Sequence, residues 1–360
     1  MLKTTPAVFA VGDQYQIMVE VEKESMMSVI VGNKTYYDAS NGIMNSLSPI
    51  HRVSVPIPQL DSARHYTVCI TPIIKRKPYY TEVESVQEFS FEFRPVPDKE
   101  IRIYHISDAH NNTCLPTKAA RAFGTIDLLV LNGDIIDHCD APENFSNIFK
   151  ICEALTNGNI PVISSRGNHD MRGNFAEKFA EYTPNCNGNT YYTFRLGKLW
   201  GIVLDCGEDK DDSHIVYGST VACHDFRQRQ TEFLKEIIKN AREEYEAPGI
   251  TTRLVISHNP FTHQLGEPFN IESDIYAEWA SLLSACVKPH LMLCGHTHEC
   301  KLINVGEPGD HLGQPCTLLI GSVLEDDVFT GAGLSITDDK ISIAFTNSNS
   351  QISAEQEILK

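Results

Sequence analysis

The chain has 360 residues, of which 42% are hydrophobic and 21% are charged, a balance typical of a globular protein with one large domain or two smaller ones. Its formal net charge of -17 argues against a nucleic-acid-binding surface, because contacts to a phosphate backbone need clustered Lys and Arg. No stretch reaches the roughly 18 uninterrupted apolar residues of a membrane span, so we expect no membrane partner.

Residues 1–97 predict a small all-β accessory domain. Short apolar or alternating runs, punctuated by Gly, Asn, Pro and Asp, occupy residues 7–11, 15–21, 27–31, 53–57, 66–74 and 89–93. Leu60 followed by Tyr66 resembles the tyrosine corner of immunoglobulin-like and fibronectin type III sandwiches. The region contains no catalytic cluster, and we interpret it as an accessory domain that can serve as a surface for homo-oligomer formation.

A linker is predicted at residues 94–100, where two prolines adjoin charged residues. Beyond it, strands alternate with helix-like segments, so residues 98–360 predict a catalytic domain of the α/β class. Within it, residues 206–223 form a polar acidic stretch that either overhangs the site described next or is a surface insertion. His214 in this stretch, His224 directly after it and His263 further on are candidate rim residues.

Five apolar runs in this second part each end in side chains that can bind a metal ion. The runs and the polar residues that follow them are 101–106 with Asp108 and His110; 127–132 with Asp134 and Asp137; 160–165 with Asn168, His169 and Asp170; 253–257 with His258; and 290–294 with His296 and His298. A single polar turn after a strand has an ordinary structural explanation. Five in succession indicate a shared site, because open sheets gather their active sites at the carboxyl ends of strands.

The donors among these residues are too many for one tetrahedral metal site. Two ions about 3.5–4 Å apart, sharing one bridging carboxylate, would use them all. Mixed imidazole and carboxylate ligands suit Mn, Fe or Zn better than Mg or Ca. Glycines directly before Asp134, Asn168 and His296 are expected to let the backbone turn sharply.

The order Asp-x-His, Gly-Asp-x-x-Asp, Gly-Asn-His-Asp, a lone His after a strand and Gly-His-x-His resembles the calcineurin-like metallophosphoesterase superfamily over roughly residues 100–345. The resemblance implies a four-layer αββα sandwich and two metal sites that share Asp134. The first site would be held by Asp108, His110, Asp134 and His298, and the second by Asp134, Asn168, His258 and His296.

The resemblance also implies the reaction. A hydroxide bridging the two ions would attack the phosphorus of a small phosphoester substrate, His169 would protonate the leaving group, and Asp137 would orient His169. Asp170 is expected to support the loop. Arg166 and Arg172 are candidate substrate-binding residues through charge-assisted contacts to phosphate, or else ordinary salt-bridge residues.

Comparison within the superfamily favours a phosphodiesterase. Purple acid phosphatases carry a Tyr at the position of Asp137 and lack the first-motif His, although they share an N-terminal β-sandwich. The presence of both His110 and Asp137 is more similar to class III cyclic-nucleotide phosphodiesterases. A phosphomonoesterase is the alternative, and a non-catalytic binding scaffold of the same fold is a remote one, because such scaffolds tend to lose the residue equivalent to His169.

The cysteines and the N-terminus bear on location. Eleven cysteines, an odd number at irregular spacing, include no Cys-x-x-Cys pair that would indicate a zinc ribbon or redox dithiol. We expect them to be reduced and to pack as small apolar side chains. No signal-peptide segment is visible, and these features together predict a cytoplasmic protein.

Overall fold

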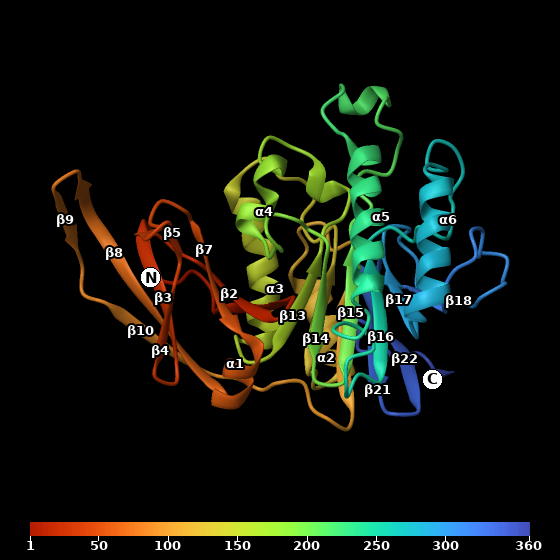
Figure 1. Ribbon diagram of the computed structural model, residues 1–360, viewed down its shortest axis with the longest axis horizontal. Helices are drawn as coiled ribbons and strands as arrows, with labels where there is room; N and C mark the ends of the chain where they lie inside the picture. The colour runs from red at the N-terminus through yellow and green to blue at the C-terminus, as the bar shows by residue number, and fades with distance from the viewer.

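Two β-sheets packed face to face, with helices on their outer faces, build the larger part of the chain (Figure 1). The structure is a computed structural model that describes residues 1–360. Figure 1 places the N-terminal strands at one end of the molecule and α5 and α6 at the other. The predicted αββα sandwich is confirmed.

The first sheet has ten strands. In spatial order they are β23 (Gln356–Leu359), β22 (Lys340–Asn347), β21 (Val328–Ile336), β11 (Ile101–Ile106), β12 (Leu128–Asn132), β13 (Pro161–Ser165), β1 (Ala7–Val11), β2 (Gln14–Glu20) and β7 (Ile50–Pro56), with β20 (Val323–Glu325) beside β21. β11, β12 and β13 are parallel neighbours. β12 and β13 are buried along their whole length, as the near-continuous apolar runs of central parallel strands require.

The second sheet has six strands and faces the first. Its strands, in spatial order, are β14 (Tyr192–Leu196), β15 (Leu199–Leu204), β16 (Thr252–Ser257), β17 (Leu291–Cys294), β19 (Leu318–Ile320) and β18 (Lys301–Ile303). β14 and β15 form the hairpin that turns at Gly197, and β15, β16, β17 and β19 are parallel. The carboxyl ends of the parallel strands in both sheets therefore define one edge of the sandwich.

Three apolar layers hold these elements together. Between the sheets, Val130 and Ile163 of the first sheet pack with Ile256 and Leu293 of the second. α2 (Cys114–Phe123) and α3 (Ser146–Thr156) cover the outer face of the ten-stranded sheet. α5 (Cys223–Lys239) and α6 (Ser273–Leu282) cover the outer face of the six-stranded sheet, where Leu234 and Trp279 are fully buried.

The N-terminal region is a two-layered β-structure, but one of its layers is part of the ten-stranded sheet. A five-stranded sheet of β10 (Gln87–Glu92), β8 (His65–Lys77), β3 (Ser25–Val31), β4 (Lys34–Tyr37) and β9 (Tyr80–Val83) packs against β1, β2 and β7. β1 pairs in parallel with β13 through Val8 and Phe9, so the ten-stranded sheet crosses the predicted boundary at residue 97. That the two parts are separate domains stays a prediction.

Two sequence interpretations of this region are corrected. It is not wholly β, because α1 (Ile57–Ala63) and a small hairpin of β5 (Ala39–Ser40) and β6 (Ile43–Met44) interrupt the strands. Tyr66 does not form a tyrosine corner: its hydroxyl donates to the carbonyl of Gly158, 92 residues further along the chain, at 2.8 Å. The tyrosine thus ties the N-terminal sheet to the loop after α3.

Two further features follow from the sequence. All eleven cysteines are unpaired and seven of them are buried, five of these within the apolar layers described above, as reduced small side chains would be. None of the helices combines the length and apolar character needed to cross a membrane.

Candidate metal centre

Five loops meet where β11, β12 and β13 of one sheet and β16 and β17 of the other end. Parallel neighbours present their carboxyl ends at the same edge of a sheet, and the two sheets are stacked, so residues far apart in sequence come together there. All seven predicted metal ligands lie in these loops: Asp108, His110, Asp134, Asn168, His258, His296 and His298.

The backbone of these loops is strained. Five of the seven residues have positive φ angles, namely Asp108 at 51°, His110 at 41°, Asp134 at 51°, His296 at 71° and His298 at 53°. Non-glycine residues seldom adopt this left-handed conformation, and it persists only where the surrounding structure compensates for its cost. The interactions that these side chains make at the site therefore outweigh the conformational energy cost of the left-handed backbone.

The glycines beside the ligands are required mainly because neighbouring atoms leave no room for a Cβ, and only at one position because the backbone turns. A Cβ on Gly167 would lie 2.1 Å from Asp134 Oδ1, and one on Gly295 would lie 2.5 Å from Asp108 Oδ2. Only Gly133 has a positive φ angle, at 75°, and a Cβ there would also meet the His258 ring at 2.6 Å. The predicted sharp turn is therefore found at Gly133, whereas Gly167 and Gly295 allow carboxylates to approach the backbone.

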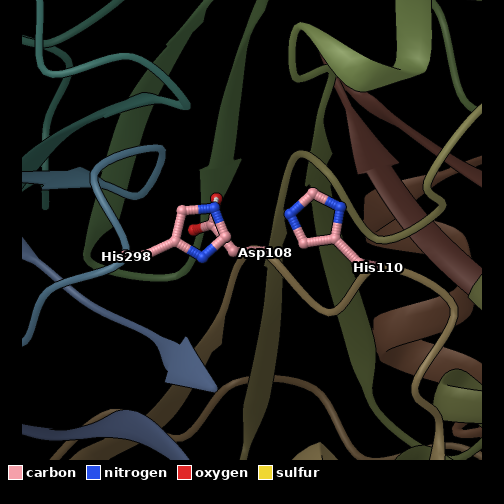
Figure 2. Close-up of side chains that lie close together, drawn as sticks. All are labelled: Asp108, His110 and His298. Atoms are coloured by element: carbon pink, nitrogen blue, oxygen red, sulfur yellow. Dashed lines mark ion pairs between the residues drawn. The ribbon is translucent and has the colours of Figure 1, made fainter. Parts of the chain in front are cut away.

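Asp108, His110 and His298 form the first cluster, with one ligand atom of each lying within 4.8 Å of the others. Figure 2 shows the three side chains reaching toward one another, Asp108 and His110 from the loop after β11 and His298 from the loop after β17. The His110 and His298 rings are stacked, with centroids 5.2 Å apart. His298 Nε2 lies 3.7 Å from Asp108 Oδ1.

Asp108, Asp134 and His258 form the second cluster, and all three are buried. His258 Nε2 lies 3.1 Å from Asp134 Oδ2 and 3.8 Å from Asp108 Oδ1. His258 Nδ1 lies 2.7 Å from the carbonyl oxygen of Asn132, to which it donates. That bond fixes the ring so that Nε2 faces the carboxylates, as for a metal-binding imidazole.

The remaining two predicted ligands adjoin this cluster. His296 Nδ1 is 2.9 Å from Asn168 Oδ1, and the rings of His296 and His258 lie 5.5 Å apart. The backbone N–H of His296 donates to both oxygens of Asp108, at 3.1 and 3.0 Å. The structure thus brings all seven residues into one continuous set of donors.

The donor set fits cations. His110 Nε2 is buried and has no hydrogen-bond partner, a costly state for a ring nitrogen unless a ligand occupies it. Burial raises the pKa of Asp108, and the Asp134 charge raises it further, although the nearby His258 acts in the opposite direction. Burial alone would also raise the pKa of Asp134, but the interaction with His258 outweighs it and lowers that pKa. Against its own burial, His258 has its pKa raised to about 10 by the two carboxylates. A metal ion can supply the positive charge that this pair of buried carboxylates requires.

His169 and Asp137 lie beside the first cluster. His169 Nδ1 is 3.0 Å from the carbonyl oxygen of Asp137 and 3.4 Å from its carboxylate, while that carboxylate is 3.1 Å from His110 Nδ1. Asp137 therefore contacts His169 chiefly through its backbone, and its side chain also orients His110. With Nδ1 donating to the carbonyl, Nε2 is the other ring nitrogen of His169, and in the structure it accepts from Arg172 Nη1 at 3.1 Å.

The two predicted arginines have different surroundings. Arg172 Nη1 lies 3.1 Å from His169 Nε2, so this guanidinium is at the centre. Arg166 is not brought to the cluster: its Nε pairs with buried Asp205 at 2.8 Å, and it lines a separate groove with Phe226. Its position is that of a structural salt bridge.

Asp170 supports the loops, as expected. Its Oδ2 accepts from the backbone N–H groups of Gly167 and Asp134, at 2.7 and 3.1 Å. Burial, followed by the nearby Asp134 charge, raises the pKa of Asp170 to about 8.

A cleft of about 460 Å³ opens over the metal centre. Besides His169 and four predicted ligands, it is lined by Asp209, His263, Leu265, Phe269, Thr297, Glu299 and Lys301. His263 is therefore a rim residue, whereas His214 and His224 line another pocket. Asp209 is the one residue of the acidic stretch 206–223 that lines this cleft, whereas Asp211, Ser213 and His214 of the stretch line the other pocket. Leu265 and Phe269, on a loop, and Lys301, the first residue of β18, carried no recognisable signal in the sequence, because only the folded path of the chain brings them here.

Comparison with known proteins gives the context. Residues 101–300, more than half of the chain, match the calcineurin-like phosphoesterase family. The fold is similar to that of purple acid phosphatase PPD1 from yellow lupin (Lupinus luteus) seeds, with a TM-score of 0.62 and 12% identity, covering 99% of this chain and 74% of that one. No curated protein sequence matches.

Two smaller structures overlap only in part. A predicted phosphoesterase from Streptococcus pneumoniae has a TM-score of 0.36 and 13% identity, covering 72% of this chain and 98% of its own. Vacuolar Protein Sorting 29 from Cryptosporidium parvum has a TM-score of 0.37 and 12% identity, covering 73% of this chain and 100% of its own. On the family match, which spans all five loops of the metal centre, the chain belongs to the calcineurin-like phosphoesterase family.

Proposed function

We propose that the protein is a dinuclear metal-dependent phosphodiesterase that acts on a small substrate. Membership of the family makes it a metal-dependent phosphoester hydrolase. The observation that supports the proposal is the convergence of seven nitrogen and oxygen donors beside the imidazole of His169, which lines an open cleft.

In this proposal the ligands would divide between two ions that share Asp134, which lies in one donor cluster with Asp108, the residue common to both clusters. Asp108, His110 and His298 would complete the first site, and Asn168, His258 and His296 the second. When bound, the ions neutralise phosphoryl oxygens and make water a better nucleophile near neutral pH. Mixed imidazole and carboxylate donors suit Mn, Fe or Zn.

His169 is the general acid of the proposed reaction. Its Nδ1 donates to the Asp137 carbonyl, so the ring presents Nε2, which accepts from Arg172 Nη1 in the structure. In the reaction Nε2 would carry the proton that goes to the leaving oxygen, with Arg172 donating to the substrate instead. Arg172, with Nη1 beside that nitrogen, is placed to bind a phosphoryl oxygen by a charge-assisted hydrogen bond.

The cleft supports a diester substrate. Beyond the predicted ligands, its lining includes Leu265 and Phe269 from one loop, Glu299 just before β18 and Lys301 at the start of β18. A diester carries a substituent on each side of phosphorus, and a cleft of about 460 Å³ lies within the usual range for small-ligand sites. His110 and Asp137 both lie at the centre, and the presence of this pair, which resembles class III phosphodiesterases, also favours a phosphodiesterase.

Phosphomonoester hydrolysis is the second candidate. The observation in its favour is the similarity of fold to a purple acid phosphatase over 99% of this chain, including the N-terminal strands. At 12% identity this similarity concerns the fold, so substrate preference has to be measured.

The test is an assay of manganese-loaded protein with an aryl phosphodiester and the matching aryl phosphomonoester. His169→Ala is the inactive control, and His65→Ala, an exposed histidine on β8, is the matched control that should retain activity. We expect higher kcat/KM for the diester. A preference for the monoester would assign the phosphatase function, and no turnover of either with two metals bound would favour a binding scaffold.

A further inference from the structure

The side chain of Arg172 is clamped by a carboxylate from the 206–223 stretch. Its Nε lies 3.1 Å from Glu208 Oε1 and its Nη2 lies 3.0 Å from Glu208 Oε2, which is a bidentate pair. Glu208 is only 1% exposed, so the pair is shielded from water on the carboxylate side. Bidentate pairing fixes the plane of a guanidinium as well as its position.

The pair with Glu208 leaves the Nη1 nitrogen of Arg172 unused. With Nε and Nη2 both engaged by Glu208, Nη1 is the nitrogen directed at His169, 3.1 Å from its Nε2. Nη2 also lies 3.6 Å from Asp209 Oδ1. The geometry therefore presents a single N–H-bearing group beside the proposed acid.

The backbone around Glu208 is fixed by the side chain of Arg227. Arg227, which is fully buried, donates from Nε to the Cys206 carbonyl at 2.7 Å and from Nη2 to the Glu208 carbonyl, bracketing the turn at Gly207. Its Nη1 pairs with Glu272 Oε1 at 3.0 Å. The backbone on both sides of Gly207 is thereby fixed to α5.

A second contact holds the Glu208 side chain. The Tyr217 hydroxyl lies 3.1 Å from Glu208 Oε2 and 3.0 Å from Asp209 Oδ1. Desolvation of a carboxylate is costly, and the protein offsets it here with three hydrogen-bond donors from two residues. A salt bridge that served only to close a surface loop would not need to be buried, bidentate and supported from two sides.

We propose that Glu208 is a positioning residue for phosphoester hydrolysis: it holds Arg172 so that the Nη1 group of the arginine binds an oxygen of the substrate phosphoryl group next to His169. The inference rests on the proposed function, because it assumes a phosphoryl group in the cleft. Glu208 itself touches neither the ligands nor the substrate, and its effect passes entirely through Arg172.

The experiment is a double-mutant cycle on the full-length, manganese-loaded protein. The variants are Glu208→Gln, Arg172→Ala and the double variant, with Glu232→Gln, an exposed residue of α5, as the matched control. The readouts are KM and kcat for an aryl phosphodiester, the dissociation constant of inorganic phosphate by calorimetry, and metal content.

We expect Glu208→Gln to raise KM and the phosphate dissociation constant about 10-fold, with kcat changed less than about 3-fold and metal content unchanged. Arg172→Ala should weaken phosphate about 100-fold, and adding Glu208→Gln to it should cause no further loss, because residues that act as one unit are not additive. Tyr217→Phe, a milder change, should show an intermediate effect.

Additive effects of the two substitutions, or a Glu208→Gln protein that binds phosphate as the wild type does, would overturn the proposal. A lower kcat with unchanged phosphate binding would do so as well. If the wild type turns over no ester, the proposed function fails, and the phosphate dissociation constants still decide whether Glu208 positions Arg172. Should Glu208→Gln not fold, Tyr217→Phe and Glu208→Asp provide the same comparison.

Discussion

His258 Nε2 lies 3.1 Å from Asp134 Oδ2, and the two buried residues come from different sheets, Asp134 after β12 and His258 after β16. The contact joins the carboxyl ends of both sheets at one point. The Asn132 carbonyl holds the His258 ring and the His169 backbone N–H donates to Asp134, so both side chains are fixed in place. A metal ion at this position would link the two halves of the sandwich.

Replacing Asp134 should remove more than one metal ion. Because Asp134 is the carboxylate shared by the two proposed sites, Asp134→Asn is expected to bring the metal content from two ions per chain to below one. Inductively coupled plasma mass spectrometry after dialysis measures this directly. Asp98→Asn, an exposed linker position, should leave the content unchanged. An Asp134→Asn protein that keeps both ions would contradict the shared-ligand assignment.

His169→Ala should lower kcat by a factor on the order of 10²–10⁴ while metal content is preserved. The loss comes from the missing proton donor, so it should be largest for an alkyl leaving group and smallest for a nitrophenolate, which leaves without protonation. Steady-state kinetics with a series of diesters checks this dependence. An equal loss across the series would assign His169 to substrate binding instead.

Much of this centre was predictable because strand ends and ligand types follow a pattern in the sequence. β1 and β11 begin and end where the apolar runs do, and each predicted ligand lies in the expected loop. The pairing of β1 with β13 was not predictable, since an apolar run carries no information about which strand edge it joins. Glu208 and Lys301 were not identified either, because their roles depend on loop paths that no local pattern encodes.

Gly167→Ala should lower metal binding and activity by a steric clash alone. The added Cβ would lie 2.1 Å from Asp134 Oδ1, so the carboxylate or the loop has to move, and a misplacement of about 1 Å can cost roughly 100-fold in kcat/KM. Gly266→Ala is the control, because its Cβ would meet nothing within 4 Å. Metal content and kcat/KM of both variants are the measurements. Normal activity of Gly167→Ala would mean that the loop relaxes without cost.

His105 should make the protein less stable in acid. The residue is fully buried on β11, its Nε2 accepts from Asn132 Nδ2 at 2.9 Å, and burial lowers the pKa of His105 to about 3. The unfolded chain binds this proton near pH 6.5 and the folded chain does not, so stability falls as pH drops through the window between these values.

The measurement is the free energy of unfolding in urea from pH 7 to pH 5. His105→Gln keeps an acceptor for Asn132 and removes the titrating group. The wild type should lose about 1.4 kcal/mol more per pH unit than this variant in the lower part of that range. Parallel pH profiles would show that His105 is protonated in the folded protein.

The continuity of the ten-stranded sheet predicts that residues 98–360 do not fold well alone. Removing residues 1–97 would leave the β1-facing edge of β13 unpaired, and exposed strand edges promote aggregation. Size-exclusion chromatography of the fragment should show aggregates where the full chain does not. A monomeric, active fragment would establish that the two predicted domains are independent.

Metal dependence of turnover tests the central claim most directly. Metal-free protein is titrated with manganese while bound metal and the rate of aryl phosphodiester hydrolysis are followed together. We predict two ions bound per chain, with the rate rising mainly as the second site fills and absent in His169→Ala. Full activity with a single ion bound, or activity that persists without metal, would contradict a dinuclear phosphoester hydrolase built on Asp134.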